Sequence, residues 1–343
     1  MVPMDAPQVS MTLPETLTQM ATGHWLAQSI YVAAKLGLAD YLTDGPQAYQ
    51  ALATATTSHA PSLYRLLRAL ASVGIFVEQD PGEFALTPLA YYLRSDVPDS
   101  LRAMALMNGE EHYQAWGNLL HSIQTGESAF TSMYGMPVFQ YLGQTPAAAA
   151  VFDQAMISYS SMEIPAVLDA YDMAGVTTVV DVAGGRGGFL AAILARYPQI
   201  QGILFDQPGV ASGAQAYLAE RGVHDRVQWV GGDFFEAVPT GGDIYLLKHI
   251  LHDWGDADCG RILRTCHQAM AKTARLLVVE MVIPGGNAPH PGKFLDLNML
   301  VMCDGGRERT AAEYRQLLET TGFQLGQILP TQAPVSVIEA VPV

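Results

Sequence analysis

Acidic residues follow three successive apolar runs in the second half of the chain. Asp181 opens the glycine-rich run Asp181-Val-Ala-Gly-Gly-Arg-Gly-Gly188, Asp206 ends the next apolar run, and Asp233 stands in Gly231-Gly-Asp-Phe234 after the third. Glycines permit a tight turn and a close approach of ligand to backbone, which predicts contacts from Gly184 and Gly185. Asp206 can accept hydrogen bonds from ribose hydroxyls, Asp233 from an adenine amino group, and Phe234 can cover the ring. The pattern predicts an adenosine site.

Two cofactor classes fit such a site. Ala183, Gly185 and Gly188 nearly satisfy the dinucleotide pattern, with an acid on the following strand, so NAD is one candidate. Asp181 argues against NAD, because its charge would face a pyrophosphate. A cationic sulfonium with an amino-acid amine tolerates acidic neighbours, and a second nucleotide-binding half is not visible. The pattern therefore favours S-adenosylmethionine, with S-adenosylhomocysteine as product.

A histidine stands where a substrate would meet that cofactor. The fourth apolar run continues into Lys248-His-Ile-Leu-His252-Asp-Trp, so His252 falls just past the carboxyl end of a strand. A phenol titrates near pH 10 and is a poor nucleophile at neutral pH. A histidine of near-neutral pKa can remove its proton, and a carboxylate on the other ring nitrogen can hold the tautomer. We expect His249, His267 and His224 to be structural.

Strands and helices that alternate after residue 177 must position these groups. The predicted tail strands Phe323–Leu329 and Ser336–Val341 lie too close together for a crossover helix, so they should pair antiparallel. Alternation before the tail predicts an α/β, doubly wound parallel sheet. The predicted parallel strands are Thr177–Val182, Gly202–Phe205, Val227–Val230, Asp243–Leu251 and Arg275–Ile283.

The N-terminal third has a helical texture. After a loose tail over residues 1–13, one helix is predicted over Pro14–Leu42, apolar on several faces, which favours packing against another subunit. The helix Pro61–Val73 and strands Ile75–Val77 and Glu83–Leu86 then form a winged helix. We interpret this as a dimerisation module of a homodimer. The alternative, a DNA-binding regulator, is disfavoured because the presumed recognition helix offers only two arginines and the chain is acidic.

Charge and cysteine content exclude several classes of binding partner. The net charge of −15 over 343 residues repels phosphate backbones and anionic lipids, so neither nucleic acid nor membrane is an expected partner. Three cysteines, Cys259, Cys266 and Cys303, match neither a disulfide framework nor a zinc site, and we see no metal-ligand cluster. The chain shows no secretory signal or membrane-spanning run. These features predict a cytoplasmic protein without a metal.

Six motifs in the second half stand in a recognisable order: DVAGGRGG, FDQPGV, GGDFF, LLKHILHDW, VVEMVIP and CDGGRERT. With LMNGEE, MYGMPVFQYL and the winged helix upstream, the chain resembles the small-molecule O-methyltransferases. That family includes plant caffeate and flavonoid enzymes and bacterial anthracycline and phenazine tailoring enzymes. The resemblance covers nearly the whole chain. It implies a class I methyltransferase domain over residues 101–343, after a dimerisation domain over residues 1–100, with the helical residues 101–171 contributing to the acceptor pocket.

The resemblance also implies roles for single residues. His252 resembles the general base, and Glu280 and Glu308 resemble the carboxylates that orient it. Lys248 resembles the lysine beside the adenine. The chain departs from the family at Ala183, where a glycine is usual. The resemblance implies an acceptor pocket lined by Met107, Asn108, Phe152, Met156 and Met299, with Tyr159 and Cys303 replacing polar residues of the plant enzymes.

The expected activity is methyl transfer from S-adenosylmethionine to a hydroxyl of a small, aromatic molecule. Three alternatives remain open: N-methylation of an aromatic heterocycle, decarboxylase or hydroxylase chemistry on the same scaffold, and NAD-dependent oxidation. His252, Glu280 and Glu308 argue against the drifted chemistries, because all three implied catalytic groups are present.

Overall fold

A computed structural model of the chain describes residues 11–343, except for the side chains of residues 211 and 212. The chain forms two compact units, Met1–Glu110 and Glu111–Val343. Of the tail predicted over residues 1–13, only the last three residues are described. Thr12 caps the first helix by accepting a hydrogen bond from the backbone of Glu15.

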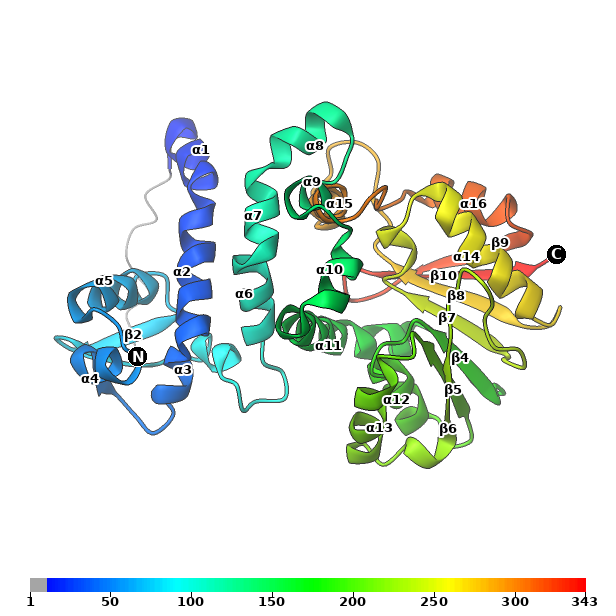
Figure 1. The fold of residues 1–343 in the computed structure, drawn as a ribbon, viewed down its shortest axis with the longest axis horizontal. Coiled ribbons are helices and arrows are strands. Elements are labelled where there is room, and N and C mark those ends of the chain that lie inside the picture. Colours follow the sequence, from blue (N-terminus) through cyan, green and yellow to red (C-terminus); the bar gives the residue numbers. More distant parts are fainter. Residues whose placement is uncertain (1–10) are drawn as a thin grey trace. The chain divides into compact units, whose positions relative to one another are not determined.

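The first unit is mostly helical (Figure 1). It also contains a small antiparallel sheet in the order β1-β3-β2. Its core gathers leucine and phenylalanine side chains from the helices and from both longer strands. The predicted winged helix is confirmed, with strand β2 displaced slightly toward the turn. The elements are α1 (Leu13–Ala21), α2 (Gly23–Leu36), α3 (Leu38–Tyr41), β1 (Gln47–Ala48), α4 (Tyr49–Ala55), α5 (Ala60–Ala71), β2 (Phe76–Asp80), β3 (Glu83–Leu86), η1 (Ala90–Leu93) and α6 (Arg102–Gly109).

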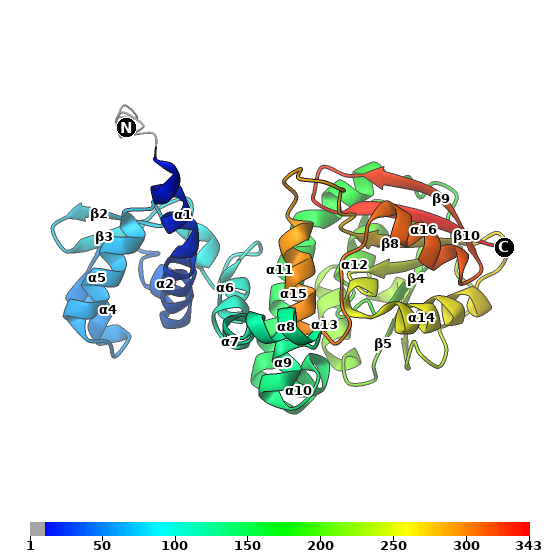
Figure 2. The ribbon, with the colours of Figure 1, turned by 90° about the horizontal axis from the view of Figure 1, so that it is seen from above.

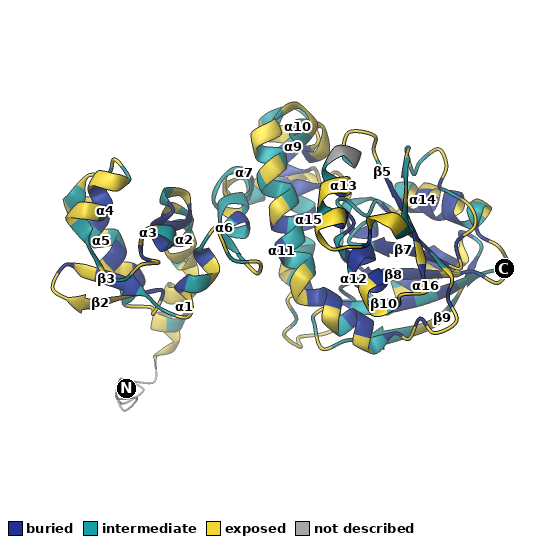
Figure 3. Ribbon diagram, turned by 90° about the horizontal axis from the view of Figure 1, so that it is seen from below, coloured by how far each residue is buried: buried dark blue, intermediate teal, exposed yellow. Residues whose placement is uncertain are grey.

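The single helix predicted over Pro14–Leu42 is wrong. The chain breaks at Thr22 and again at Gly37, whose φ of 66° is left-handed and ends α2. Glycine adopts that conformation without the steric cost that other residues incur. All nine residues of α1 remain at least partly exposed, and Figure 3 shows little burial along this helix.

The second unit contains a seven-stranded sheet in the order β6-β5-β4-β7-β8-β10-β9. The first five strands in this order, β6, β5, β4, β7 and β8, pair in parallel with their neighbours. Strand β10 pairs antiparallel with both β8 and β9. The predicted doubly wound sheet with an antiparallel C-terminal edge is thus confirmed. The strands are β4 (Thr178–Val182), β5 (Gln201–Asp206), β6 (Val227–Gly231), β7 (Ile244–Lys248), β8 (Arg275–Glu280), β9 (Phe323–Pro330) and β10 (Ser336–Pro342).

Helices cover both faces of this sheet (Figure 2). Alternate strand residues point to opposite faces, so Val179 packs in a core with α11, α12 and α13, while Val180 packs in a second core with α14 and α16. The helices are α7 (Glu111–Gly117), α8 (Leu119–Thr125), α9 (Ala129–Tyr134), α10 (Val138–Gln144), α11 (Pro146–Ala170), α12 (Gly188–Arg196), α13 (Ala211–Glu220), α14 (Asp256–Ala269), α15 (Gly292–Met302) and α16 (Ala311–Glu319).

Two predicted strands prove too long. Strand β7 ends at Lys248 rather than Leu251, because His249 has a left-handed φ of 53° and the short 3-10 helix η3 (Leu251–Asp253) follows. Strand β8 ends at Glu280 rather than Ile283. Both ends lie at the carboxyl edge of the parallel strands, where ligands of doubly wound folds bind.

Among the described helices, none is both long and apolar enough to cross a membrane.

Candidate active site

The glycine-rich turn after β4 is built around two aspartates. A Cβ on Gly184 would come within 2.5 Å of the Asp181 carboxyl carbon, so a larger residue cannot stand there. Gly185, with a φ of 59°, donates its backbone N–H to Asp206 Oδ2 at 2.8 Å, and Gln207 donates to Asp206 Oδ1 at 2.7 Å. The turn therefore holds the carboxylate of Asp206 at the end of β5.

Asp181 lies buried beneath this turn. Burial, followed by the charge of Asp206, raises the pKa of Asp181 to about 7. Its Oδ2 is buried without a hydrogen-bond partner among the described residues. A buried acceptor without a partner lowers the stability of the fold unless a hydrogen-bond donor or a cation binds to it. The glycine cradle and the unpaired acid fit a positively charged nucleoside such as S-adenosylmethionine.

The groups predicted to contact adenine come from the ends of β6 and β7. Asp233 Oδ1 accepts the backbone N–H of Phe235 at 2.8 Å, and the Phe234 ring packs edge-on against Trp254. Lys248 is tied to α11, because its Nζ donates to Ser160 Oγ at 2.9 Å and lies 3.2 Å from Glu163 Oε2. Its ammonium group is thus already engaged.

His252 lies in η3, buried among carboxylates. Its Nδ1 lies 2.7 Å from Glu308 Oε1 and 3.4 Å from Glu280 Oε2, and its Nε2 lies 3.6 Å from Asp253 Oδ1. The structure therefore brings together the three residues predicted as catalytic. Asp253 is a fourth group that the sequence reasoning missed, although it is the next residue in the chain.

Glu280 holds the backbone of this turn. Its Oε1 accepts N–H groups of Ile250 and Leu251 at 3.0 Å, and of His252 at 3.4 Å. Burial alone would raise the pKa of Glu280, but the charges of His252 and His249 and the backbone donors lower it to about 2. Glu280 is therefore a carboxylate at every working pH.

The near-neutral pKa expected for His252 is wrong. Burial alone would lower the pKa of this imidazole, but Glu280, Asp253 and Glu308 outweigh burial and raise it to about 10. Three carboxylates from separate segments stabilise the imidazolium, and no sequence spacing predicts their convergence. The resting His252 is consequently protonated at neutral pH.

Arg309 is a second group that the sequence reasoning missed. This fully buried guanidinium donates to the carbonyls of Leu251 and Trp254 at 2.8 and 2.9 Å, and to Asp256 Oδ1 at 2.7 Å. It braces η3 from the segment that also carries Glu308. Arg309 stands in the motif GGRERT, directly after Glu308, and its place in that motif was the sequence feature that could have pointed to it.

The residues predicted to line the acceptor pocket lie on α6, α11 and α15, except Cys303, which directly follows α15. Phe152, Met156 and Tyr159 follow one face of α11, and the Tyr159 ring lies edge-on to His249 at 5.7 Å. Burial, then Glu163 and Glu308, raise the pKa of Tyr159 to about 12. Met299 lies in α15, and the thiol of Cys303 donates to Asp253 Oδ1 at 3.7 Å.

Met107 and Asn108 lie on α6, in the first unit. Asn108 Nδ2 donates to the carbonyl of Met104 at 2.9 Å, a bond within its own helix. The placement of both residues in the acceptor pocket stays a prediction.

Among the described residues, one group of three side chains lies close enough together to hold a metal ion. His249, His252 and Glu280 each offer a ligand atom, and these atoms lie within 4.8 Å of one another. His252 is already bonded to Glu308, and Glu280 to three backbone amides. The set is therefore better described as a hydrogen-bonded network.

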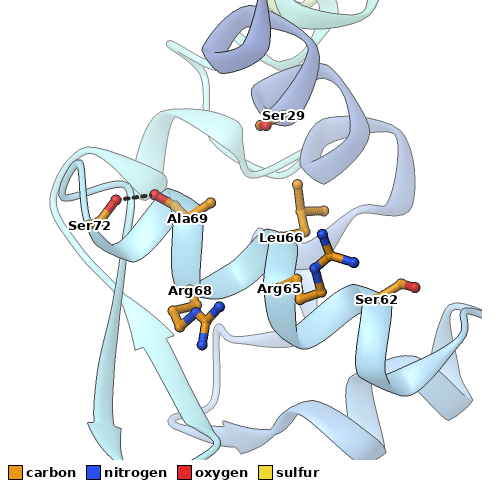
Figure 4. Close-up of a pocket in the computed structure, with 7 residues that line it drawn as sticks. All are labelled: Ser29, Ser62, Arg65, Leu66, Arg68, Ala69 and Ser72. Carbon is orange, nitrogen blue, oxygen red and sulfur yellow. Dashed lines mark hydrogen bonds between the residues drawn. The ribbon is translucent and has the colours of Figure 1, made fainter.

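An open hollow of about 610 Å³ lies elsewhere, in the first unit (Figure 4). Arg65, Arg68 and Ser62 of α5 line it together with Ser29 of α2. None of the predicted site residues lines it.

Family models match both units. The O-methyltransferase domain matches residues 116–324, and the O-methyltransferase dimerisation domain matches residues 18–96. The chain belongs to the O-methyltransferase family. It is an S-adenosylmethionine-dependent O-methyltransferase, a family that requires no metal, and this replaces the interpretation as an NAD-dependent oxidoreductase.

Curated relatives match over nearly their full length. A phenazine O-methyltransferase of Lysobacter antibioticus is 49% identical over 96% of this chain and 97% of its own. A mitomycin biosynthesis 6-O-methyltransferase of Streptomyces lavendulae is 40% identical over 95% and 93%. A phenazine-1-carboxylate N-methyltransferase of Pseudomonas aeruginosa is 36% identical over 91% and 92%. O- and N-methylating enzymes therefore both resemble the present one.

Solved structures of methyltransferases superpose on nearly the whole chain. The crystal structure of LaPhzM superposes with a TM-score of 0.95 at 49% identity, covering 97% of this chain and all of that one. An O-methyltransferase from neocarzinostatin biosynthesis, solved with S-adenosylmethionine and 2-hydroxy-5-methyl naphthoic acid, has a TM-score of 0.83 at 33% identity, covering 97% of this chain and 100% of that one.

Proposed function

We propose that this enzyme methylates a hydroxyl of a flat, fused-ring aromatic metabolite of the phenazine or quinone class. Its relatives include a phenazine O-methyltransferase at 49% identity and a mitomycin biosynthesis enzyme at 40%. The predicted pocket residues Phe152, Met156 and Met299 are apolar, as a flat aromatic ring requires.

The observation that carries the catalytic proposal is the 2.7 Å contact between His252 Nδ1 and Glu308 Oε1. Neutral His252 keeps its proton at Nδ1, directed at Glu308, and offers Nε2 to the acceptor hydroxyl. Its pKa of about 10 is close to that of a phenol, also near 10, so the proton can pass between them without a large free-energy cost. A cation bound beside His252 would lower this pKa toward the working range.

The cofactor residues have matching roles. When bound, S-adenosylmethionine supplies the methyl group from its sulfonium sulfur. Asp206 would accept from the ribose hydroxyls, Asp233 from the adenine amino group, and Asp181 would offer a negative charge to the cationic end. Gly184 and Gly185 would leave room for the cofactor at the turn, and Phe234 would cover the adenine. Lys248 would contribute its aliphatic stem, since its ammonium binds Ser160 and Glu163.

The enzyme is proposed to act as a homodimer in the cytoplasm. The dimerisation domain model covers residues 18–96, and apolar side chains of α1 and α2 lie exposed in the single chain. Leu13, Leu17, Met20 and Trp25 are 66–87% exposed. A second copy packing on this face would bury them, as in obligate interfaces.

The test is a panel of acceptors with isotope-labelled S-adenosylmethionine. We expect methylation of hydroxyphenazines or hydroxyquinones at an oxygen, with simple phenols poorer. Phenazine-1-carboxylate, which has no hydroxyl outside its acid, serves as the discriminating acceptor. Methylation of its ring nitrogen would replace the proposed O-methylation with N-methylation, the activity of the Pseudomonas aeruginosa relative. No transfer to any hydroxyl of the panel would overturn the acceptor proposal.

A further inference from the structure

One cationic side chain stands among the glycines of the turn after β4. Arg186 lies between Gly185 and Gly187, whose φ values of 59° and 79° are left-handed, a conformation that glycine adopts at low steric cost. Its side chain runs along α13, because a Cβ added to Gly213 would come within 3.4 Å of Arg186 Nε. The side chain is 34% exposed. The turn proposed to receive the cofactor therefore carries a partly exposed guanidinium.

The partner of this guanidinium is Asp153 on α11. Arg186 Nη2 donates to Asp153 Oδ2 at 3.2 Å, and this is its one side-chain hydrogen bond among the described residues. A guanidinium has five N–H donors and can bind a carboxylate with two of them at once. A single contact between two partly exposed groups contributes little stability, so Arg186 can turn to another carboxylate.

Asp153 also places the pair beside the proposed cofactor site. Burial, aided by the charge of Asp153 and opposed by backbone donors, raises the pKa of the Asp206 carboxyl above its ordinary value. Asp153 and Asp206 are therefore close enough for their charges to interact. The ammonium of Lys248, at the end of β7, is already engaged by Ser160. An anionic ligand group entering among these acids would be repelled everywhere except at Arg186.

S-adenosylmethionine carries such a group. Its amino-acid end bears an ammonium and a carboxylate on the same carbon atom, close to the cationic sulfur. Aspartates can pair with the two positive charges but not with the carboxylate. We propose that Arg186 binds this carboxylate and that Asp153 competes with it for the guanidinium. The inference rests on the proposed cofactor site at this turn.

The test is calorimetric binding of three ligands to Arg186→Gln. Decarboxylated S-adenosylmethionine lacks only the carboxylate, and S-adenosylhomocysteine keeps the carboxylate but lacks the cationic sulfur. We expect the variant to bind S-adenosylmethionine and S-adenosylhomocysteine about 10–100-fold more weakly, the usual effect of a lost charge-assisted hydrogen bond. Its affinity for the decarboxylated ligand should not fall, which also shows that the variant is folded.

Two further variants sharpen the test. Asp153→Asn removes the competing carboxylate, so it should bind S-adenosylmethionine up to about 5-fold more tightly without strengthening the decarboxylated ligand. Arg196→Gln is the matched control, because Arg196 lies at the other end of α12 and pairs with Asp169 of α11 at 2.6 Å. Its affinities for all three ligands should equal those of the wild type.

An equal loss for all three ligands in Arg186→Gln, or no loss for any of them, overturns the inference. Weaker binding of S-adenosylmethionine by Asp153→Asn contradicts the proposed competition. Asp206→Asn separates this failure from failure of the site itself. If that variant binds all three ligands like the wild type, the proposed cofactor site is wrong. If it weakens all three while Arg186→Gln does not discriminate between them, only the present inference fails.

Discussion

Glu308 Oε1 lies 2.7 Å from Nδ1 of His252, and both side chains are buried. Glu280 approaches the same nitrogen less closely, at 3.4 Å, and devotes its other oxygen to three backbone amides. The two carboxylates therefore have different tasks. Glu308 orients the imidazole, and Glu280 holds the turn that carries it.

Matched glutamine variants should separate these tasks. Glu280→Gln replaces charge-assisted hydrogen bonds to the backbone with neutral ones, so we expect a loss of about 1–2 kcal/mol in unfolding free energy. Glu308→Gln should cost less stability but lower kcat about 100-fold or more, because the carboxylate that supports the imidazolium is gone. Urea unfolding and steady-state kinetics measure both. Equal losses of stability in the two variants would contradict the assignment.

Replacing His252 by asparagine should change the rate and its pH dependence. We expect kcat/KM at neutral pH to fall about 10²–10⁴-fold, the usual loss for a general base. In the wild type, kcat/KM of the free enzyme should climb into the alkaline range, because His252 must lose a proton held with a pKa of about 10. The variant should lose least with an acidic nitrophenol, which needs no base. Unchanged affinity for S-adenosylmethionine in calorimetry is the control, and a wild-type rate with a weakly acidic phenol would rule out this role.

The positions of the residues proposed to bind the cofactor could be predicted from the sequence, because parallel strands bring their carboxyl ends to one edge of the sheet. Asp181 and Asp206 lie near the carboxyl ends of β4 and β5, Asp233 and His252 follow β6 and β7, and strand order alone predicts that they lie at one edge. Motif order supplied Glu280 and Glu308 through the resemblance.

The electrostatics could not be predicted in this way. The pKa of His252 depends on carboxylates from η3, β8 and the loop before α16, whose convergence no local pattern records. Glu163 is 86 residues from His249 in the chain, and no spacing rule connects them. Gly37 is a residue type that commonly ends helices, so the break could have been predicted there. The apolar residues that continue on both sides of it favoured a single helix instead.

Dimer formation should depend on the exposed face of α1 and α2. Leu17→Asp together with Trp25→Asp places charges where a second copy would bury apolar side chains, so we expect the sedimenting species to change from dimer to monomer. Val343→Asp is the control, because Val343 is 74% exposed at the C-terminus, away from α1 in sequence. A wild-type protein that sediments as a monomer at micromolar concentration would refute the homodimer.

Ala183→Gly should stabilise the fold. Ala183 has a φ of 57°, where a Cβ costs about 1–2 kcal/mol, while the added chain entropy of glycine costs about 0.5–1 kcal/mol. We expect a net gain of about 0.5–1 kcal/mol in unfolding free energy. Ala192→Gly, inside α12, is the matched control and should lose about 1 kcal/mol. If Ala183→Gly loses stability as the control does, the left-handed strain at this turn is absent.

Asp181→Asn should increase the stability of the fold at alkaline pH and weaken the binding of the cofactor. The folded-state pKa of Asp181, about 7, lies above its ordinary value of 3.8, so the folded protein binds this proton more tightly than the unfolded chain. Its contribution to stability is present below about pH 4 and is lost as the pH rises through about 7. The amide has no charge to bury, so the variant should be more stable at pH 8, by at most about 4 kcal/mol from three pKa units, and unchanged at pH 4.

Cofactor binding provides the second half of this test. A cation placed near Asp181 favours its ionised form, so binding of S-adenosylmethionine near neutral pH should release a proton from this carboxyl. Calorimetry in buffers of different ionisation enthalpy measures that release. We expect Asp181→Asn to abolish most of it and to weaken binding by more than about 1 kcal/mol, since it removes a charged partner. Asp169→Asn, an exposed aspartate on α11, is the control. Undiminished affinity and proton release in Asp181→Asn would place the cationic end of the cofactor elsewhere.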